Sequence, residues 1–177
     1  HKLLYKINTT CMLEIALQKG KQLPVSKRYV VAQHEQVEKL ALSYGYEIIH
    51  NKHPEKGISH SIVLAVNSCK EDDGILFMVA DQPLLKETTL QNILEKADEK
   101  HIVCVGNHDN FQNPMLFPKR YYEELLQLQG DKGAKKIAYV HKENVICVPC
   151  EKDEVFDFDT KKELQQFMME GLNKDKC

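Results

Sequence analysis

Short apolar runs alternate with longer amphipathic stretches along the chain. The short runs, most of them rich in β-branched residues, predict strands at 28–32, 46–50, 74–80 and 101–107. Apolar side chains at helical spacing predict helices at 34–45, 57–69 and 86–100. Strands and helices that alternate in this way are typical of βαβ units. This part of the chain therefore predicts an α/β fold with a mostly parallel central sheet and helices on both faces.

The run at 74–80, "GILFMVA", is apolar throughout, which predicts a central parallel strand covered on both faces. The pattern is less regular after residue 107, where we expect an edge strand at 114–118, helices at 119–128 and 132–142, a strand at 144–150 and a helix at 160–172. The last helix carries a core-facing stripe at helical spacing, formed by Leu164, Phe167, Met168 and Leu172. No linker, repeat or low-complexity segment divides the chain, so one domain is expected.

Composition narrows the functional classes. Lysine and arginine number 24 against 26 acidic residues, so no broad basic surface for nucleic acid is expected. No apolar run approaches the ~18 residues of a membrane span. The polar start of the sequence and six irregularly spaced cysteines predict reduced thiols in a cytoplasmic protein. Cys147 and Cys150 form the one close pair, but their strand-like surroundings and the lack of a second ligand pair argue against a redox or zinc site.

Asp81 follows directly after the apolar run at 74–80, in "FMVADQPLL". In an open α/β sheet, ligands bind beyond the carboxyl ends of the strands, so this carboxylate is expected in the ligand cleft. A carboxylate oxygen suits Mg²⁺ that carries substrate phosphates, and Pro83 ends the strand behind it. The structural alternative is that Asp81 only caps the following turn.

A second acidic pair lies in "FDFDTKKEL", residues 156–164. Asp157 and Asp159 alternate with phenylalanines, so both carboxylates are expected on the same side of an extended segment. Thr160 and Glu163 have the spacing of a helix capping box. Capping leaves the two aspartates unexplained, and one of them is a candidate second metal ligand.

Two glycine-containing loops precede predicted helices. In "EKGISHSI", backbone N–H groups and the hydroxyls of Ser59 and Ser61 suit an anion or a nucleobase, although helix capping by either serine is an equal alternative. The loop "GDKGAKK", residues 130–136, has the character of an ordinary helix–helix connection when taken alone. Three histidines with uneven spacing are interpreted as solvated loop residues, namely His50, His53 and His60.

Together these segments resemble the nucleotidyltransferases that complete molybdenum cofactors. These are the molybdopterin cytidylyl- and guanylyltransferases and the related accessory proteins of molybdenum hydroxylases. The resemblance extends over essentially the whole chain in six motifs, "KLLYKIN", "GISHS", "VADQPLL", "NPMLF", "GDKGAKK" and "FDFDT". The most specific is "VADQPLL", which resembles the metal-aspartate strand end of the family. His60, Gln112 and Lys135 differ from the usual family residues but leave the acidic positions intact.

The resemblance implies a three-layer, Rossmann-like nucleotidyltransferase fold of the nucleotide-diphospho-sugar transferase type. It assigns roles to the matching positions: catalysis to Asp81 and Lys2, nucleotide binding to Lys2, Gly57, Ser59, Ser61 and Asp81, substrate binding to Asn113, Pro114, Asp131 and Lys135, and Mg²⁺ binding to Asp81 and Asp159. In the family, a first strand and a Gly-rich triphosphate loop precede the position of Lys2. We therefore expect a single nucleotidyltransferase domain over residues 1–177 that lacks both.

The implied reaction is Mg²⁺-dependent transfer of a nucleotidyl group from CTP or GTP to the phosphate of molybdopterin, with release of pyrophosphate. The implied partners are the nucleoside triphosphate and molybdopterin, with a molybdenum hydroxylase apoenzyme as a further candidate, and neither nucleic acid nor a membrane. Two alternatives stay open, a sugar-phosphate nucleotidyltransferase and a non-catalytic molybdopterin carrier or insertion chaperone. The sequence does not distinguish CTP from GTP.

Overall fold

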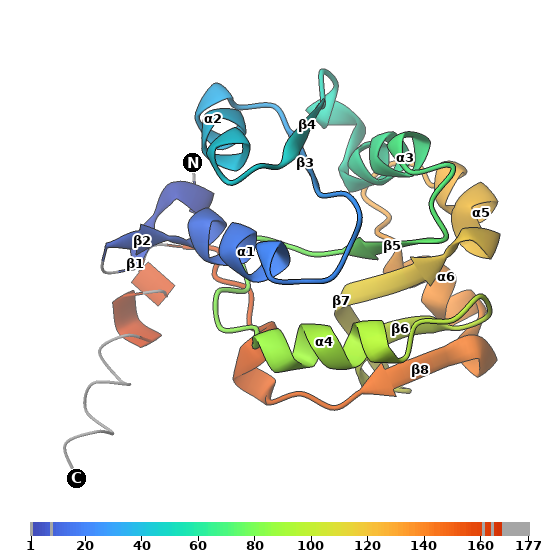
Figure 1. The fold of residues 1–177 in the computed structure, drawn as a ribbon. Coiled ribbons are helices and arrows are strands. Elements are labelled where there is room, and N and C mark those ends of the chain that lie inside the picture. The colour runs from blue at the N-terminus through green and yellow to red at the C-terminus, as the bar shows by residue number, and fades with distance from the viewer. Residues whose placement is uncertain (1, 8, 161, 164, 168–177) are drawn as a thin grey trace, which may run out of the picture.

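The computed structural model describes residues 2–7, 9–160, 162–163 and 165–167 (Figure 1). Its strands are β1 (Lys6–Ile7), β2 (Thr10–Cys11), β3 (Tyr29–Ala32), β4 (Glu47–His50), β5 (Gly74–Phe77), β6 (Ile102–Asn107), β7 (Asn110–Pro118) and β8 (Val145–Val148). Its α-helices are α1 (Met12–Lys21), α2 (Glu35–Ser43), α3 (Ile58–Ser68), α4 (Glu87–Glu95), α5 (Tyr122–Leu126) and α6 (Lys135–Val140). Short 3₁₀ turns are η1 (Lys2–Leu4), η2 (Pro54–Lys56), η3 (Lys119–Tyr121), η4 (Lys142–Asn144) and η5 (Lys152–Val155).

The central sheet has the strand order β5-β7-β6-β8. Strands β6 and β8 pair in parallel, whereas β7 is antiparallel to both of its neighbours, β5 and β6. Strands β5, β6 and β8 therefore run in one direction, and β3 and β4 form a separate parallel pair. This arrangement confirms the predicted α/β fold with mostly parallel strands.

Helices cover both faces of the central sheet, which gives three layers (Figure 1). On one face, α3, α5 and α6 pack on β6 and β7 around the fully buried Phe111 and Phe117. On the other face, α4 packs Ile93 against Val103 and Val105 of β6. Because β6 is apolar and buried from Ile102 to Val105, it has the composition expected of a strand between two helical layers.

The prediction of an edge strand at 114–118 is wrong, because β7 is longer and lies between β5 and β6. A β-bulge explains how the interior strand accommodates a proline. Met115 pairs with Cys104 and Gln112 with Val105, so Asn113 and Pro114 fall outside the regular ladder. Proline has no N–H group to donate, and the irregular register avoids the need for one.

The prediction of a central parallel strand at 74–80 is also wrong in part. Strand β5 ends at Phe77, pairs antiparallel with β7 and stands at the edge of the four-stranded sheet. Met78 and Ala80 leave the ladder and pack in two different apolar clusters, near Leu85 and near Ala41 respectively. The apolar run is therefore continuous because it contributes to several clusters, and not because the whole run is one strand.

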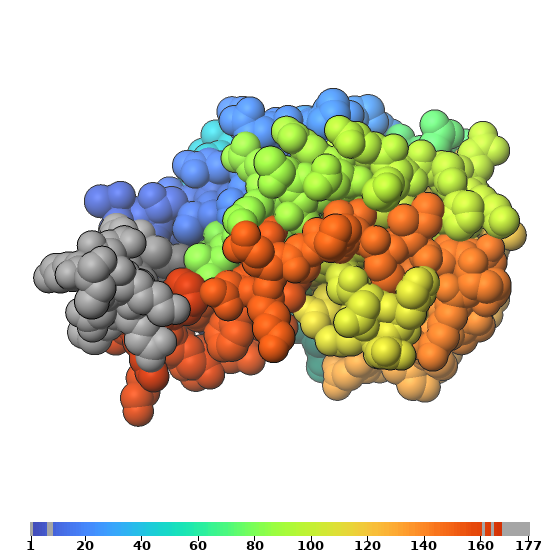
Figure 2. All heavy atoms as spheres, turned by 90° about the horizontal axis from the view of Figure 1, so that it is seen from below, coloured from blue at the N-terminus to red at the C-terminus, as the bar shows by residue number. Residues whose placement is uncertain are grey.

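Segments near both ends of the described chain pack close to the end of β5. Strands β1 and β2 form an antiparallel pair that leads into α1, for which the apolar pattern gave no prediction. The segment after β8, orange to red in Figure 2, lies beside the green loop that precedes α4.

The predicted helix at 160–172 falls mostly outside the described residues, including three of its four stripe residues, Leu164, Met168 and Leu172. None of the helices in the described ranges combines the length and the hydropathy that a bilayer span requires.

Candidate active site

Three charged side chains converge near the end of β5. The Lys2 ammonium donates a hydrogen bond to Asp81 Oδ2 at 2.8 Å and another to Asp159 Oδ1 at 2.7 Å. Asp81 is the most shielded, with 20% of its side chain exposed, against 34% for Lys2 and 72% for Asp159. The two aspartates predicted to share a metal ion are therefore brought within hydrogen-bonding distance of one cation.

Asp159 is placed by the extended segment that follows η5. Phe158 N donates to Asp81 O at 3.0 Å, which joins this segment to the end of the β5 run. The Phe158 side chain is 1% exposed and packs with Met12 of α1. Because side chains alternate along an extended chain, burial of Phe158 turns Asp157 and Asp159 away from this apolar cluster.

The predicted capping box after Asp159 is present. Glu163 Oε2 accepts hydrogen bonds from Thr160 N at 2.9 Å and from Asp159 N at 3.1 Å. In return, Glu163 N donates to Thr160 Oγ1 at 3.1 Å. The backbone of Asp159 is therefore held on both sides, by Phe158 and by the cap.

The cluster of charges shifts two pKa values. Partial burial opposes the charge of Lys2, but the hydrogen bonds that the ammonium donates to Asp159 and Asp81 outweigh this effect and raise its pKa. Although Asp157 is exposed, partial desolvation by its surroundings raises its pKa, and repulsion from Asp81 and Asp159 acts in the same direction, against a hydrogen bond from Gln82. One ammonium thus faces three carboxyl groups, and the surplus of acidic groups favours binding of a further cation.

The donor set suits Mg²⁺ bound to a nucleotide. The Lys2 ammonium demonstrates that a cation fits between the Asp81 and Asp159 carboxylates. Mg²⁺ is usually held by one or two carboxylates together with substrate phosphates and water. Among the residues that the structure describes, no group of three or more His, Cys, Asp or Glu side chains is arranged to hold a metal ion. A metal here would therefore take its remaining ligands from phosphate oxygens and water.

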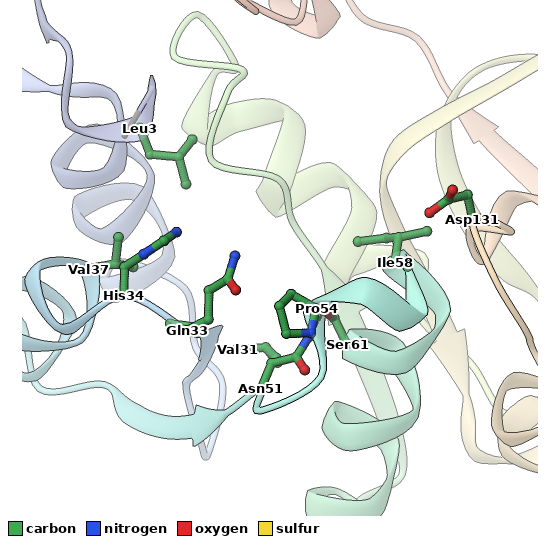
Figure 3. Close-up of a pocket in the computed structure, with 12 residues that line it drawn as sticks. Leu3, Val31, Gln33, His34, Val37, Asn51, Pro54, Ile58, Ser61 and Asp131 are labelled. Atoms are coloured by element: carbon green, nitrogen blue, oxygen red, sulfur yellow. Dashed lines mark hydrogen bonds between the residues drawn. The ribbon is translucent and has the colours of Figure 1, made fainter.

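The turn η1 contributes to a second feature as well, because Leu3, which follows Lys2, lines a cavity of about 340 Å³. This volume is in the range of cavities that bind small ligands. Figure 3 shows Leu3 and Ile58, from η1 and from the start of α3, on opposite sides of the cavity, with Gln33 between them. Other apolar parts of the wall come from Val31, Val37 and Pro54.

Several polar residues of the cavity were not predicted from the sequence. Gln33 and His34 follow β3, and Asn51 follows β4. The Asn51 side chain is buried, donates to Ser61 Oγ at 3.1 Å and accepts from His53 N at 2.9 Å. Their position directly after two parallel strands is the sequence signal that identifies them, since ligands gather at the carboxyl ends of such strands.

The two glycine loops predicted to bind ligands are in contact with each other. Gly57 has φ +80°, and a Cβ there would lie 2.5 Å from Asp131 Oδ1 and 2.6 Å from the Gly130 backbone. Gly57, Ser61 and Asp131 line the cavity. Ser59 differs, because its side chain is 2% exposed and its backbone N–H donates to Gly130 O at 3.2 Å. The predicted anion site at the start of α3 therefore has one of its N–H groups already bonded to protein.

The other predicted substrate-binding residues belong to other elements. Asn113 and Pro114 lie in the irregular part of β7, and Lys135 is the first residue of α6. Within the described ranges, none of the three lines the cavity or bonds to Lys2. Their proposed role in substrate binding stays a prediction.

Several solved structures have this fold at low sequence identity. A nucleotidyl transferase from Methanothermobacter thermautotroptrophicus has a TM-score of 0.83 at 20% identity, over 98% of this chain and 86% of that protein. Rv0371c of Mycobacterium tuberculosis H37Rv, in complex with manganese, has a TM-score of 0.73 at 21% identity, over 95% of this chain and 91% of that protein. Molybdopterin-guanine dinucleotide biosynthesis protein A of Archaeoglobus fulgidus has a TM-score of 0.64 at 21% identity, over 93% of this chain and 87% of that protein.

The sequence also matches a known family over most of its length. Residues 1–145 correspond to the MobA-like NTP transferase domain. The match includes Lys2, Asp81 and both glycine loops, and it ends before Asp159. The fold is that of the nucleotide-diphospho-sugar transferase type, as predicted. The chain belongs to the MobA-like NTP transferase domain family and is a nucleotidyltransferase.

Proposed function

We propose that this nucleotidyltransferase transfers a cytidylyl or guanylyl group from CTP or GTP to the phosphate of molybdopterin, with Mg²⁺ and with release of pyrophosphate. The observation that carries the proposal is the convergence of Lys2, Asp81 and Asp159 around one cation position. The six family motifs support molybdopterin as the acceptor, as does the similarity to a protein named for molybdopterin-guanine dinucleotide biosynthesis. A molybdenum hydroxylase apoenzyme is the proposed recipient of the product.

The nucleoside is proposed to bind in the cavity, with its triphosphate beside Lys2. Adjacent residues connect the two features, since Leu3 lines the cavity while Lys2 reaches the two carboxylates. The apolar wall around Ile58 suits the flat face of a base, and the Gln33 amide offers both a donor and an acceptor for its edge. In this arrangement, the phosphates are proposed to reach Asp81 and Asp159 through Lys2.

The proposed chemistry depends on positioning and on charge. An oxygen of the acceptor phosphate attacks the α-phosphorus in line, the bond to the β-phosphate oxygen breaks, and pyrophosphate leaves. Mg²⁺ held there would neutralise phosphate oxygens that otherwise repel the incoming phosphate. Asp81 and Asp159 provide the carboxylates for that ion, and Lys2 is proposed to turn from them to the triphosphate. No residue acts as a covalent nucleophile in this scheme.

The decisive experiment measures pyrophosphate release by the full chain with Mg²⁺, CTP or GTP, and either molybdopterin or a sugar phosphate. The matched control is Asp81→Asn, which keeps the side-chain size and removes the charge. Release that requires both molybdopterin and Asp81 supports the proposal. Release only with a sugar phosphate identifies a sugar-phosphate nucleotidyltransferase. Binding of molybdopterin without release, with either nucleotide, identifies a carrier.

A further inference from the structure

The loop before α4 and the segment after β8 are joined at several points, and one of these contacts does not involve the charged cluster. Glu154 is buried, with 3% of its surface exposed. Its carboxylate accepts hydrogen bonds from Lys86 N at 3.0 Å and from Thr89 Oγ1 at 2.5 Å. This contact ties η5 to the first turn of α4, and it stabilises the region without contacting Lys2, Asp81 or Asp159.

A second contact lies next to the aspartates. Gln82 directly follows Asp81, and its side chain is buried, with 7% of the residue exposed. Its amide nitrogen donates to Asp157 Oδ1 at 2.8 Å and to Val155 O at 3.4 Å. Gln82 follows the proposed metal ligand Asp81, and Asp157 lies two positions before the other proposed ligand, Asp159. The Gln82 side chain therefore joins the two segments that carry the ligands.

The Gln82 amide is not fully satisfied by these contacts. The amide nitrogen donates to both Asp157 Oδ1 and the backbone carbonyl of Val155, so the amide oxygen faces away from these two acceptors. Gln82 Oε1 is buried and has no hydrogen-bond partner in the described part of the chain. An unpartnered buried acceptor lowers stability, so a stabilising role does not by itself account for a glutamine at this position.

The charges around Asp157 indicate what the amide does. Asp157 experiences repulsion from both Asp81 and Asp159. The Lys2 ammonium forms ion pairs with those two aspartates. Asp157 instead accepts a hydrogen bond from the Gln82 amide. Without the Gln82 amide, Asp157 would lose this hydrogen bond, and the backbone that carries the neighbouring Asp159 would lose the restraint that the bond provides.

We propose that Gln82 is a positioning residue for divalent-metal binding. By holding Asp157, it fixes the segment that presents Asp159 opposite Asp81, and so sets the separation of the two carboxylates that grip the ion. This inference rests on the proposed function, because it takes Asp81 and Asp159 as the metal ligands. Asp157 then serves as the anchor of Gln82 and not as a third ligand.

The test is the affinity of the full chain for Mn²⁺, measured from the electron paramagnetic resonance of the free ion. Gln82→Leu keeps the side chain close in size and removes the amide. We expect Mn²⁺ binding about 10-fold weaker, the low end of the effect of removing a group that orients a metal ligand. Asp157→Leu is expected to give a similar loss. Asp157→Asn keeps an acceptor for Gln82 and is expected to bind Mn²⁺ within about 2-fold of the unmodified chain.

The double variant Gln82→Leu with Asp157→Leu distinguishes one shared role from two separate ones. If the two residues act only through each other, the double variant binds Mn²⁺ no more weakly than either single variant. Thr89→Val is the matched control, because it removes a buried contact between the same two segments at the remote end. It is expected to lower the urea midpoint of unfolding and to leave Mn²⁺ binding unchanged.

The outcomes separate this inference from the proposed function. Mn²⁺ binding by the unmodified chain that does not depend on Asp81 contradicts both. Asp81-dependent binding that Gln82→Leu leaves unchanged contradicts only the positioning role. Strongly weakened binding in Asp157→Asn also overturns it, because Asp157 would then itself be a metal ligand. If Thr89→Val weakened Mn²⁺ binding as much as Gln82→Leu does, Gln82 would be a general stabilising residue and not a positioning residue.

Discussion

The charged cluster and the cavity both take a residue from η1, Lys2 and Leu3 respectively, but the protein builds them in different ways. The cluster joins Lys2 with Asp81 and Asp159, from segments far apart in sequence, through hydrogen bonds of 2.7–2.8 Å. The cavity is mostly formed by β3, by the segments that follow β3 and β4, and by the first turns of α2 and α3. Much of its wall is apolar, as at Ile58. One feature is defined by fixed charges and the other by shape.

This difference separates two tasks of the proposed enzyme. Charges fixed by several hydrogen bonds stabilise a transition state because they do not have to reorganise during the reaction. An apolar wall distinguishes ligands by fit, and the loss of one or two methylene groups changes binding only modestly. Substitutions in the cluster are therefore expected to reduce turnover strongly, and substitutions in the cavity to change nucleotide affinity in small steps.

Asp81→Asn is expected to have the largest effect. The substitution removes the more shielded of the two carboxylates at the proposed metal position while the side-chain size is kept. Turnover should fall on the order of 100-fold or more, since orienting groups behind a ligand already contribute 10–100-fold. Pyrophosphate release measures the loss, and an unchanged circular dichroism spectrum shows that the fold is retained. Full activity in this variant would remove Asp81 from the metal site.

Lys2→Met is expected to affect turnover and metal binding in opposite directions. Loss of the ammonium should lower turnover about 10- to 100-fold, because a charge on the triphosphate disappears. Mn²⁺ binding without nucleotide should strengthen a few-fold, because the ammonium between Asp81 and Asp159 no longer competes with the ion. Lys6→Met, at an exposed lysine of β1, is the matched control and should change neither quantity. Weaker Mn²⁺ binding in Lys2→Met would contradict the competition.

Asp159→Asn is expected to have a smaller effect on metal binding than Asp81→Asn. The Asp159 side chain is 72% exposed, so water partly replaces what the substitution removes. We expect Mn²⁺ affinity to fall about 10-fold, measured by titration with the free ion as the signal. Asp153→Asn, at an exposed residue of η5 in the same segment, is the control and should bind Mn²⁺ normally. An unchanged titration in Asp159→Asn would make Asp159 a structural residue.

The charged cluster was accessible from sequence for a physical reason. A carboxylate at the end of an apolar run, as at Asp81, has few structural explanations, and the alternation around Asp157 and Asp159 fixes their direction. The position of Lys2 between the two aspartates was not predicted, because no local pattern reports which distant side chains meet. Gln82 was missed for the same reason, since its partner Asp157 lies on another segment.

The fold was predictable to a similar extent. Local periodicity located β3, α2, β4 and α3 to within a few residues, because each has one clear apolar face. It did not predict the interior position of β7, which depends on pairing with both β5 and β6 and on a bulge at Pro114. The residues that line the cavity form no charge pattern in the sequence. Taken alone, Gln33 and Ile58 look like ordinary surface residues.

Ile58→Ala is expected to have the smallest effect and tests the cavity side of the comparison. Ile58 lines the cavity and is 50% exposed, so truncation should hardly change the stability of the fold. If a nucleoside rests on this side chain, KM for the triphosphate should rise about 3- to 5-fold while kcat is unchanged, as for a contact made equally in the ground state and the transition state. Leu42→Ala, at a 57% exposed residue of α2 outside the cavity, is the control. A fall in kcat at constant KM would instead assign Ile58 to the reacting end of the site.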